Sequence, residues 1–314
     1  MRQIDLGKSG LMASEITLGC MRMHDLSVAE AARTIRTALD VGISFFDHAD
    51  IYARPHGVSE EIFGQAVREL GLRRENMIIQ TKCGIQRSAD KTRTVAYNFS
   101  KDYIISCAEQ SLQRLQVDYI DLLALHRPDT LMEPEEVAAA FDALHTSGKV
   151  RYFGVSNQTP GQMALLQKYT DHKLLVNQLQ FGLVHTGILD TGINANMKNT
   201  HSVDHDGAIL DYCRLHDITI QAWSPFRPAI GGDVFIDNPA YPELNATLQE
   251  LAEIYGVSKD AVAAAWILRH PAKIQVLVGS MNPSRIVQFA KATTFTLSRE
   301  EWYALYMAAG NMLP

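Results

Sequence analysis

The stretch Ile43-Ser44-Phe45-Phe46-Asp47-His48-Ala49-Asp50-Ile51-Tyr52 combines a buried-strand pattern with groups that can take part in chemistry. Its apolar run ends at Asp47, and Tyr52 follows five residues later. Consecutive rather than alternating apolar residues are typical of a parallel strand covered on both faces. Asp47 and Tyr52 therefore follow the carboxyl end of a predicted strand, where an α/β barrel keeps its reactive groups.

Similar apolar runs recur along the chain, separated by segments whose apolar residues have helical spacing. The runs predict eight strands, at residues 16–19, 43–47, 77–82, 119–126, 150–156, 174–180, 218–224 and 274–279. Segments such as 27–41, 101–115 and 135–145 predict helices between them. Eight strand–helix units in 314 residues predict a single (β/α)8 TIM barrel domain over residues 1–314.

Local signals refine this architecture. Ser27 and Ser100 precede helical segments as N-caps, and Gly42 and Gly148 follow helices as left-handed ends. Outside the eight units we predict an N-terminal β-hairpin closing the barrel floor, two loops on the catalytic face and a helix packed on the outside, at residues 1–15, 186–206, 225–241 and 298–309. No Gly-x-Gly-x-x-Gly follows the first strand, which argues against a doubly wound dinucleotide-binding sheet.

Composition and charge exclude several classes of protein. The chain is 46% hydrophobic with a net charge of −6, which favours a well-packed fold and argues against binding of a nucleic-acid backbone. No apolar run approaches the length of a membrane span, and the N-terminus lacks a signal core, so we expect a cytoplasmic protein. The cysteines lack zinc spacing and predict reduced thiols; Cys83, beside Lys82, is interpreted as a barrel-lining residue rather than a reactive thiol.

Four titratable side chains follow three of the predicted strands. Asp47 and Tyr52 follow the second strand, Lys82 ends the third and His126 ends the fourth. An ammonium beside a phenol lowers the pKa of the phenol, and a carboxylate holds the ammonium charged and in place. This combination suits the transfer of a proton to a carbonyl oxygen.

Each of these groups also has a purely structural explanation. Asp47 and Lys82 could form an ion pair inside the barrel, Tyr52 could be a loop aromatic that covers the rim, and His126 could bond the backbone of the next turn. His201 and His205 lie four residues apart and could bind a metal, but two further ligands are not evident nearby, and we predict no metal. We favour the chemical interpretation because the structural ones would all have to hold at the same rim.

Taken in chain order, these motifs resemble the aldo-keto reductase superfamily over nearly the full length. The family's Asp-Thr-Ala-x-x-Tyr is matched by residues 47–52, and its lysine and histidine by Lys82 and His126. Its Gly-x-Ser-Asn, Asn-Gln, aromatic-Ser and Gly-Ser-to-Arg motifs are matched by residues 154–157, 177–178, 223–224 and 279–285. The Asp-His-Ala-Asp-Ile-Tyr version of the first motif is similar to that of a bacterial oxidoreductase subgroup.

The resemblance implies an NADPH-dependent reductase of aldehyde or ketone carbonyls. Tyr52 would donate the proton, Lys82 and Asp47 would support it, and His126 would orient the carbonyl oxygen. The implied cofactor contacts are Met21, Ser156, Asn157, Gln178, Trp223, Ser224, Phe226, Gly279, Ser280 and Arg285. Among these, Trp223 would stack on the nicotinamide, and Ser280 and Arg285 would meet the 2′-phosphate. We expect a wide, open substrate pocket, lined by Met21, Tyr52, Arg54, Phe181 and Phe226.

The chain departs from the family pattern at several positions. His48 replaces the usual Thr, Ala53 the glycine after the tyrosine, and Gly279 a frequent lysine, while Gln288 and Phe289 replace Glu and Asn. NADP(H) preference then rests mainly on Arg285, and use of NAD(H) stays open. We expect a small-molecule carbonyl substrate and a monomer as one option for the oligomeric state.

Two other functions are weighed against the reductase. A cofactor-binding, redox-sensing or regulatory subunit with slow turnover would want a sizeable partner-binding surface. A metal-dependent hydrolase would want His-x-His after the first strand, which Gly19-Cys20-Met21-Arg22 does not offer.

Overall fold

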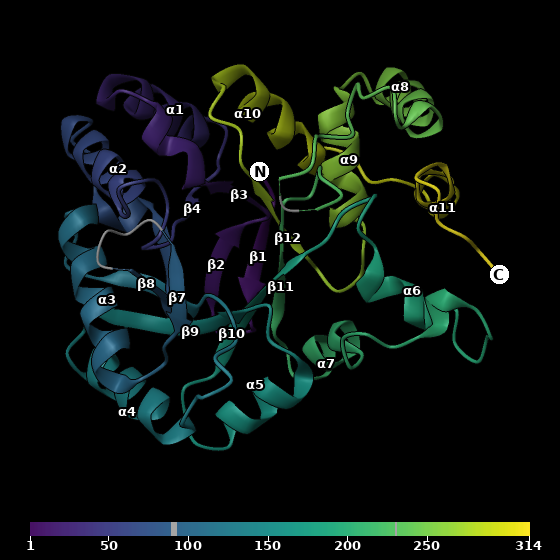
Figure 1. The fold of residues 1–314 in the computed structure, drawn as a ribbon. Helices are drawn as coiled ribbons and strands as arrows, with labels where there is room; N and C mark the ends of the chain where they lie inside the picture. The colour runs from purple at the N-terminus through teal and green to yellow at the C-terminus, as the bar shows by residue number, and fades with distance from the viewer. Residues whose placement is uncertain (89–92, 230) are drawn as a thin grey trace.

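The computed structural model describes residues 1–88, 93–229 and 231–314. Its parallel strands pair in chain order and close into an eight-stranded barrel, which confirms the predicted fold (Figure 1). The barrel strands are β3 (Ile16–Gly19), β4 (Phe45–Asp47), β5 (Ile78–Cys83), β8 (Ile120–Leu125), β9 (Val150–Ser156), β10 (Leu174–Gln180), β11 (Thr219–Trp223) and β12 (Gln275–Val278). Every predicted strand is present, with ends that differ by two residues or fewer.

Helices surround the strands, as Figure 1 shows. They are α1 (Val28–Asp40), α2 (Val58–Glu69), α3 (Lys101–Leu115), α4 (Pro134–Thr146), α5 (Pro160–Gln167), α6 (Gly187–Ile193), α7 (Ile209–Leu215), α8 (Pro242–Tyr255), α9 (Lys259–Leu268), α10 (Pro283–Ala290) and α11 (Arg299–Ala308). Short 3-10 turns lie at Cys20–Asp25, Arg74–Asn76, Thr200–Ser202 and Lys291–Thr293.

The predicted helix ends are largely confirmed. Ser27 accepts from the backbone of Glu30 and forms a capping box with it. Ser100 stands at the predicted N-cap of α3, but its side chain makes no capping bond. Gly42 and Gly148 have φ of +85° and +73°, the left-handed conformation expected of them.

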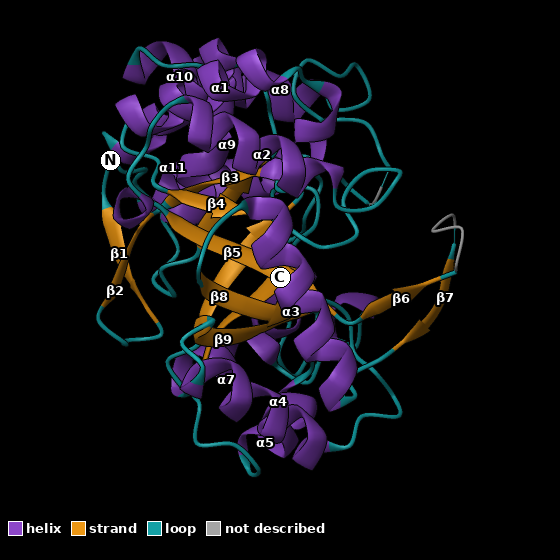
Figure 2. Cartoon of the chain, turned by 90° about the vertical axis from the view of Figure 1, so that its left-hand side faces the viewer, coloured by secondary structure: helices purple, strands orange, loops and turns teal. Residues whose placement is uncertain are grey.

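Two hairpins lie at opposite ends of the barrel (Figure 2). The predicted N-terminal hairpin, β1 (Gln3–Leu6) with β2 (Leu11–Ser14), packs Leu6 and Ala13 against Phe45 and Leu122 and so closes the floor. The other, β6 (Ile85–Arg87) with β7 (Thr94–Tyr97), follows the carboxyl end of β5 and was not predicted.

The two segments predicted as loops on the catalytic face differ. Residues 186–206 contain α6 and the turn at Thr200–Ser202, so the prediction of a plain loop was wrong there. Helix α6 is tied to the end of the chain, because Tyr306 donates to Asp190 at 2.8 Å and Thr186 donates to Asn311 at 3.0 Å. Residues 225–241 hold no helix or strand in their described part, which excludes residue 230.

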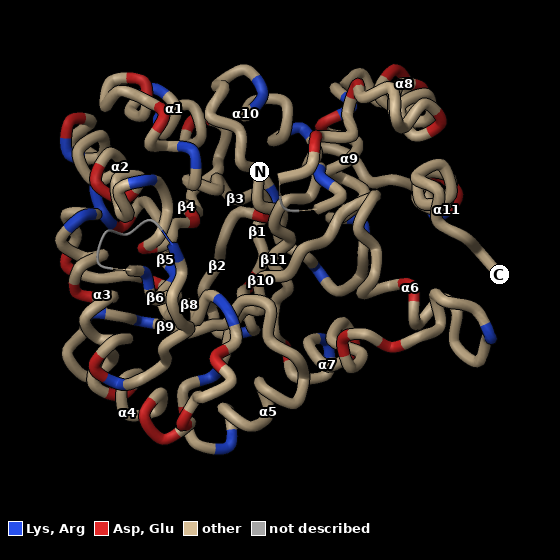
Figure 3. The backbone as a smooth tube through the Cα atoms, in the orientation of Figure 1, with Lys and Arg blue, Asp and Glu red and all other residues tan. Residues whose placement is uncertain are grey.

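Helix α11 packs on the outside, as predicted. Trp302 stacks on Trp266 of α9 with ring centroids 4.8 Å apart, and each indole N–H donates to the other's carbonyl at 3.0 Å. Charges of both signs are mixed over the outer helices (Figure 3). Among the described residues, no helix has the length and apolarity that crossing a bilayer requires.

Substitution of Gly64 tests how closely α2 and α3 pack. A Cβ there would lie 2.6 Å from the carbonyl oxygens of Arg114 and Leu115. Because backbone cannot move aside cheaply, we expect Gly64→Ala to destabilise the fold by roughly 1–3 kcal/mol in denaturant unfolding. Gly161→Ala in α5 is the matched control, since nothing lies within 4 Å of its new methyl group. An equal loss in both variants would contradict this packing.

Candidate active site

The ammonium of Lys82 lies fully buried at the carboxyl end of β5. It donates to the Asp47 carboxylate at 2.8 Å, to the His48 carbonyl at 2.6 Å and to the Tyr52 hydroxyl at 3.1 Å. An ammonium has three N–H donors, so all of them are used. A buried charge is tolerated only with such partners.

Asp47 is held by two glutamines as well as by Lys82. Gln80 and Gln178 donate to its Oδ1 at 2.6 and 3.0 Å. Both also donate to Gln221, which donates to Gln275 at 2.8 Å, and Gln275 donates to the Ser14 carbonyl at 2.7 Å. A buried glutamine chain thus connects the floor hairpin with the carboxylate.

Sequence reasoning missed the structural part that this glutamine chain plays. Gln80, Gln221 and Gln275 lie in β5, β11 and β12, within runs that were interpreted only as apolar strands. The available signal was an amide in each of three otherwise buried strands. Buried amides require partners, and partners inside a barrel come from neighbouring strands.

Tyr52 and His126 face each other at the mouth. Their rings meet edge to face with centroids 6.1 Å apart. Burial raises the pKa of Tyr52 above 10, although Lys82 acts to lower it, so the expected net lowering is wrong for this structure. Burial, and then the charge of Lys82, lowers the pKa of His126 well below 6.5. The phenol is therefore protonated and the imidazole neutral at pH 7.

Lys82 remains charged despite its burial. Burial lowers the pKa of Lys82, but attraction to Asp47 and then to Tyr52 outweighs it and leaves that pKa above 10.5. The site therefore holds a fixed positive charge beside a neutral phenol. This arrangement can stabilise a phenolate once a proton leaves.

The predicted nicotinamide contacts are brought together beside these four groups. Trp223 donates to the side chain of Asn157 at 3.1 Å, Asn157 donates to Ser156 at 2.8 Å, and Ser156 donates to the Gln178 carbonyl at 2.9 Å. The amide N–H groups of Gln178 are used by Asp47 and Gln221, so its Oε1 is the atom that suits an incoming amide donor. A partly exposed indole with an amide acceptor nearby fits a nicotinamide carboxamide.

The residues predicted for the phosphate end follow β11 and β12 or lie in α10. Arg285 is paired with Asp260 and lies over the ring of Phe289, 5.7 Å from its centroid. Phe226 is buried and stacks on Phe289 at 5.1 Å, so it supports this end by packing. The other members of the set are partly or fully exposed: Ser224, Gly279 and Ser280.

The structure agrees only in part with the expected lining of the substrate pocket. Met21 is 50% exposed and Arg54 is exposed, so both are open to a ligand. Phe181 has no exposed surface, and its ring packs against Trp266 at 5.4 Å. This burial against α9 places Phe181 in the core instead of in the pocket.

A buried polar cluster behind Lys82 was not predicted as part of the site. His48 is buried with neither ring nitrogen bonded among the described residues, and burial, followed by Lys82, lowers its pKa to about 3. Burial, and then the charge of Glu60, raises the pKa of Asp50 to about 7. Glu60 itself is held by Thr81 at 2.6 Å and by Arg114 at 2.7 Å.

The cysteines are free, as predicted, and all four are also buried: Cys20, Cys83, Cys107 and Cys213. Burial, and then neighbouring Cys107 and Asp50, raises the pKa of Cys83 well above 9, which supports the bystander interpretation over a reactive thiol. His201 lies in the turn at Thr200–Ser202, and the described residues contain no group of three or more His, Cys, Asp or Glu able to hold a metal.

Comparison with known proteins identifies the family of the chain. The Aldo/keto reductase family profile matches residues 15–308. An uncharacterized oxidoreductase of Bacillus subtilis, YcsN, is 38% identical over 98% of both chains. A 6-dehydroglucose reductase of Novosphingobium aromaticivorans is 35% identical over 98% of this chain and 96% of its own. The crystal structure of an aldo-keto reductase from Klebsiella pneumoniae in complex with NADPH superposes with a TM-score of 0.76 at 24% identity, covering 100% of this chain and 96% of that one, and it shows the shared fold.

The raised pKa of Asp50 predicts a pH dependence of stability. Between 3.8 and about 7 the folded chain holds a proton that the unfolded chain has released, so stability should fall as pH rises through this range and level off above it. Asp50→Asn cannot ionise, so relative to it the wild type should lose on the order of 1–3 kcal/mol between about pH 5 and pH 8. Denaturant unfolding at several pH values measures this difference. Asp118→Asn, at an exposed position, should follow the wild type, and parallel curves for Asp50→Asn and wild type would refute the assignment.

Proposed function

The chain belongs to the aldo/keto reductase family, which makes it an NAD(P)H-dependent oxidoreductase, and we propose that it reduces aldehyde or ketone carbonyls with Tyr52 as the proton donor. One observation carries the proposal. The buried ammonium of Lys82 touches both the hydroxyl of Tyr52 and the carboxylate of Asp47, at the mouth where the barrel strands end.

The residues divide the work of carbonyl reduction between them. The nicotinamide supplies a hydride to the carbonyl carbon when the cofactor is bound. Tyr52 gives its proton to the carbonyl oxygen as negative charge develops there, and the phenolate left behind is stabilised by Lys82. Asp47 holds Lys82 in place, and neutral His126 donates a ring N–H that orients the carbonyl oxygen. Tyr52 then regains a proton from water.

At the nicotinamide end, Gln178, Asn157, Ser156 and Trp223 would fix which face of the ring is presented. Gln178 is itself oriented by Asp47 and Gln221, so the carboxylate that fixes Lys82 also fixes a cofactor contact. Met21, Ser224, Gly279, Ser280 and Arg285 would hold the rest of the dinucleotide, with Phe226 packed beneath them.

The exposure of side chains at the mouth of the barrel indicates which substrates could enter. With Met21 and Arg54 exposed, we propose a wide pocket that accepts small carbonyl compounds of several kinds. The relative named 6-dehydroglucose reductase makes oxidised sugars one class to include in a substrate panel. We further propose that residues 1–314 act as one domain in the cytoplasm, where the four thiols stay reduced.

Loss of NADPH absorbance with a generic aromatic aldehyde tests the proposal. Tyr52→Phe should lose roughly 10²–10⁴-fold in kcat, the contribution of a general acid, while NADPH binding measured by tryptophan fluorescence stays near wild type. Tyr169→Phe is the matched control, because this exposed tyrosine lies between α5 and the amino end of β10, away from the carboxyl ends of the strands that form the mouth, and it should keep full activity.

Three results would count against the proposal. Undiminished turnover by Tyr52→Phe would remove Tyr52 as the donor. Tight NADPH binding by the wild type without turnover of any carbonyl in the panel would favour the redox-sensing subunit. Activity that appears only with added metal would favour the hydrolase.

A further inference from the structure

Arg285, the cation proposed for the 2′-phosphate, already has a carboxylate partner. Its Nη2 donates to Oδ1 of Asp260 at 2.5 Å. Asp260 lies in the first turn of α9 and Arg285 in the first turn of α10, so the pair joins the starts of two helices. The Arg285 side chain is 41% exposed and that of Asp260 15%, so the guanidinium is open to a ligand while its partner is mostly covered.

The guanidinium of Arg285 is held in place but still has N–H donors to offer a ligand. Asp260 engages one nitrogen, and the ring of Phe289, stacked in turn on Phe226, lies under the guanidinium. A guanidinium carries five N–H donors, so donors remain for phosphate oxygens. The residues therefore fit a phosphate group, with an acidic side chain directly beside it.

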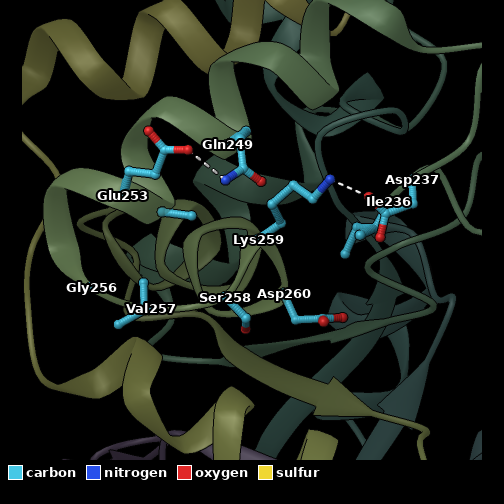
Figure 4. Close-up of a pocket in the computed structure, with 10 residues that line it drawn as sticks. Ile236, Asp237, Gln249, Glu253, Gly256, Val257, Ser258, Lys259 and Asp260 are labelled. Carbon is cyan, nitrogen blue, oxygen red and sulfur yellow. Dashed lines mark hydrogen bonds and ion pairs between the residues drawn. The ribbon is translucent and has the colours of Figure 1, made fainter.

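A second cation nearby is neutralised in the same way. Lys259, next to Asp260, pairs with Asp237, and Figure 4 shows its side chain extended toward that carboxylate. Lys259 and Asp237 line a hollow of about 340 Å³, and Asp260 lines it as well. Gly279 stands where many family members carry a lysine. The charge offered to an anion at this end is therefore much smaller than the number of cations suggests.

We infer that Asp260 is a specificity-determining residue that weakens the preference for a 2′-phosphorylated cofactor and keeps NADH usable beside NADPH. The inference rests on the proposed function, because it assigns Arg285 to that phosphate. The carboxylate cancels the charge of Arg285 and repels a phosphate that carries close to two negative charges at neutral pH. Toward a cofactor without that phosphate, a carboxylate can accept a hydrogen bond from the ribose 2′-hydroxyl, as acidic residues do in NAD sites.

Calorimetric titration with fragments of the cofactor tests this without turnover. The probes are adenosine 2′,5′-bisphosphate and adenosine 5′-monophosphate, which differ in the 2′-phosphate. The wild type should bind the two within about ten-fold of each other, and Asp260→Asn should raise the ratio on the order of ten-fold by tightening the bisphosphate. Asparagine keeps the shape and can still accept from Arg285, so only the charge is removed.

Matched variants separate this effect from general ones. Glu253 lines the same hollow, but its carboxylate accepts a hydrogen bond from Gln249 and not from Arg285. Removing this charge with Glu253→Gln should leave the ratio of bisphosphate to monophosphate affinity unchanged. Arg285→Met should lower the ratio, and the gain from Asp260→Asn should shrink in the Arg285→Met background because the two side chains act as a pair. Asp260→Ser provides a second test should Asp260→Asn not fold.

Two results would overturn the inference: an unchanged or smaller ratio in folded Asp260→Asn or Asp260→Ser, or an equal rise in Glu253→Gln. If the fragments bind in the expected pattern but the protein reduces no carbonyl, the inference about Asp260 holds and the reductase proposal fails. Failure of the inference would likewise leave Tyr52 chemistry intact.

Discussion

A fully buried ammonium is the constraint on which the mouth of this barrel depends. Lys82 has no exposed surface, so each of its N–H groups needs an acceptor inside the protein. Asp47 and the His48 carbonyl supply two, and the third is the Tyr52 hydroxyl, which is the atom where chemistry is proposed. Satisfying the charge and placing the phenol are therefore the same structural event. The same contacts therefore stabilise the fold and prepare the reaction, which explains why Asp47 and Tyr52 adopt one arrangement with Lys82, although Lys82 lies 35 and 30 residues further along the chain.

The constraint extends below the site through hydrogen bonds. Asp47 accepts from Gln80 and Gln178, and Gln221 and Gln275 continue the chain to the floor hairpin. Every glutamine side chain in this hydrogen-bonded network is buried, so the orientation of each amide is set by the amide it bonds. Gln178 is fixed by Asp47 and Gln221, and its Oε1 is the acceptor proposed for the nicotinamide carboxamide. The polar interior thus supplies rigidity, which lets the barrel hold an ammonium and two amides within hydrogen-bond distance of one carboxylate.

The sequence was sufficient to predict the barrel and the four candidate reactive groups at its mouth, because both predictions depend on short local patterns. Consecutive apolar residues mark the strands, and the candidate reactive side chains lie at the strand ends or within a few residues after them. It was insufficient wherever the outcome depends on partners far along the chain. Phe181 was expected to line the pocket, but its ring is buried against Trp266, a partner in a helix far along the chain. The pKa of Tyr52 was expected to fall because the lysine was visible in the sequence, whereas the burial that dominates was not. Helix α6 lies in a segment of loop-like composition and is stabilised by Tyr306 and Asn311, more than a hundred residues away.

The most direct test of the central claim is a kinetic double-mutant cycle on Tyr52 and Lys82, with kcat/KM for carbonyl reduction measured in Tyr52→Phe, Lys82→Met and the combined variant. If the phenol and the ammonium act as one proton-donating unit, the combined variant should be no slower than the slower single variant, because either loss already disables the unit. Losses that multiply in the combined variant would show that the two groups contribute independently, and the buried ammonium would then not be what prepares the phenol for reaction.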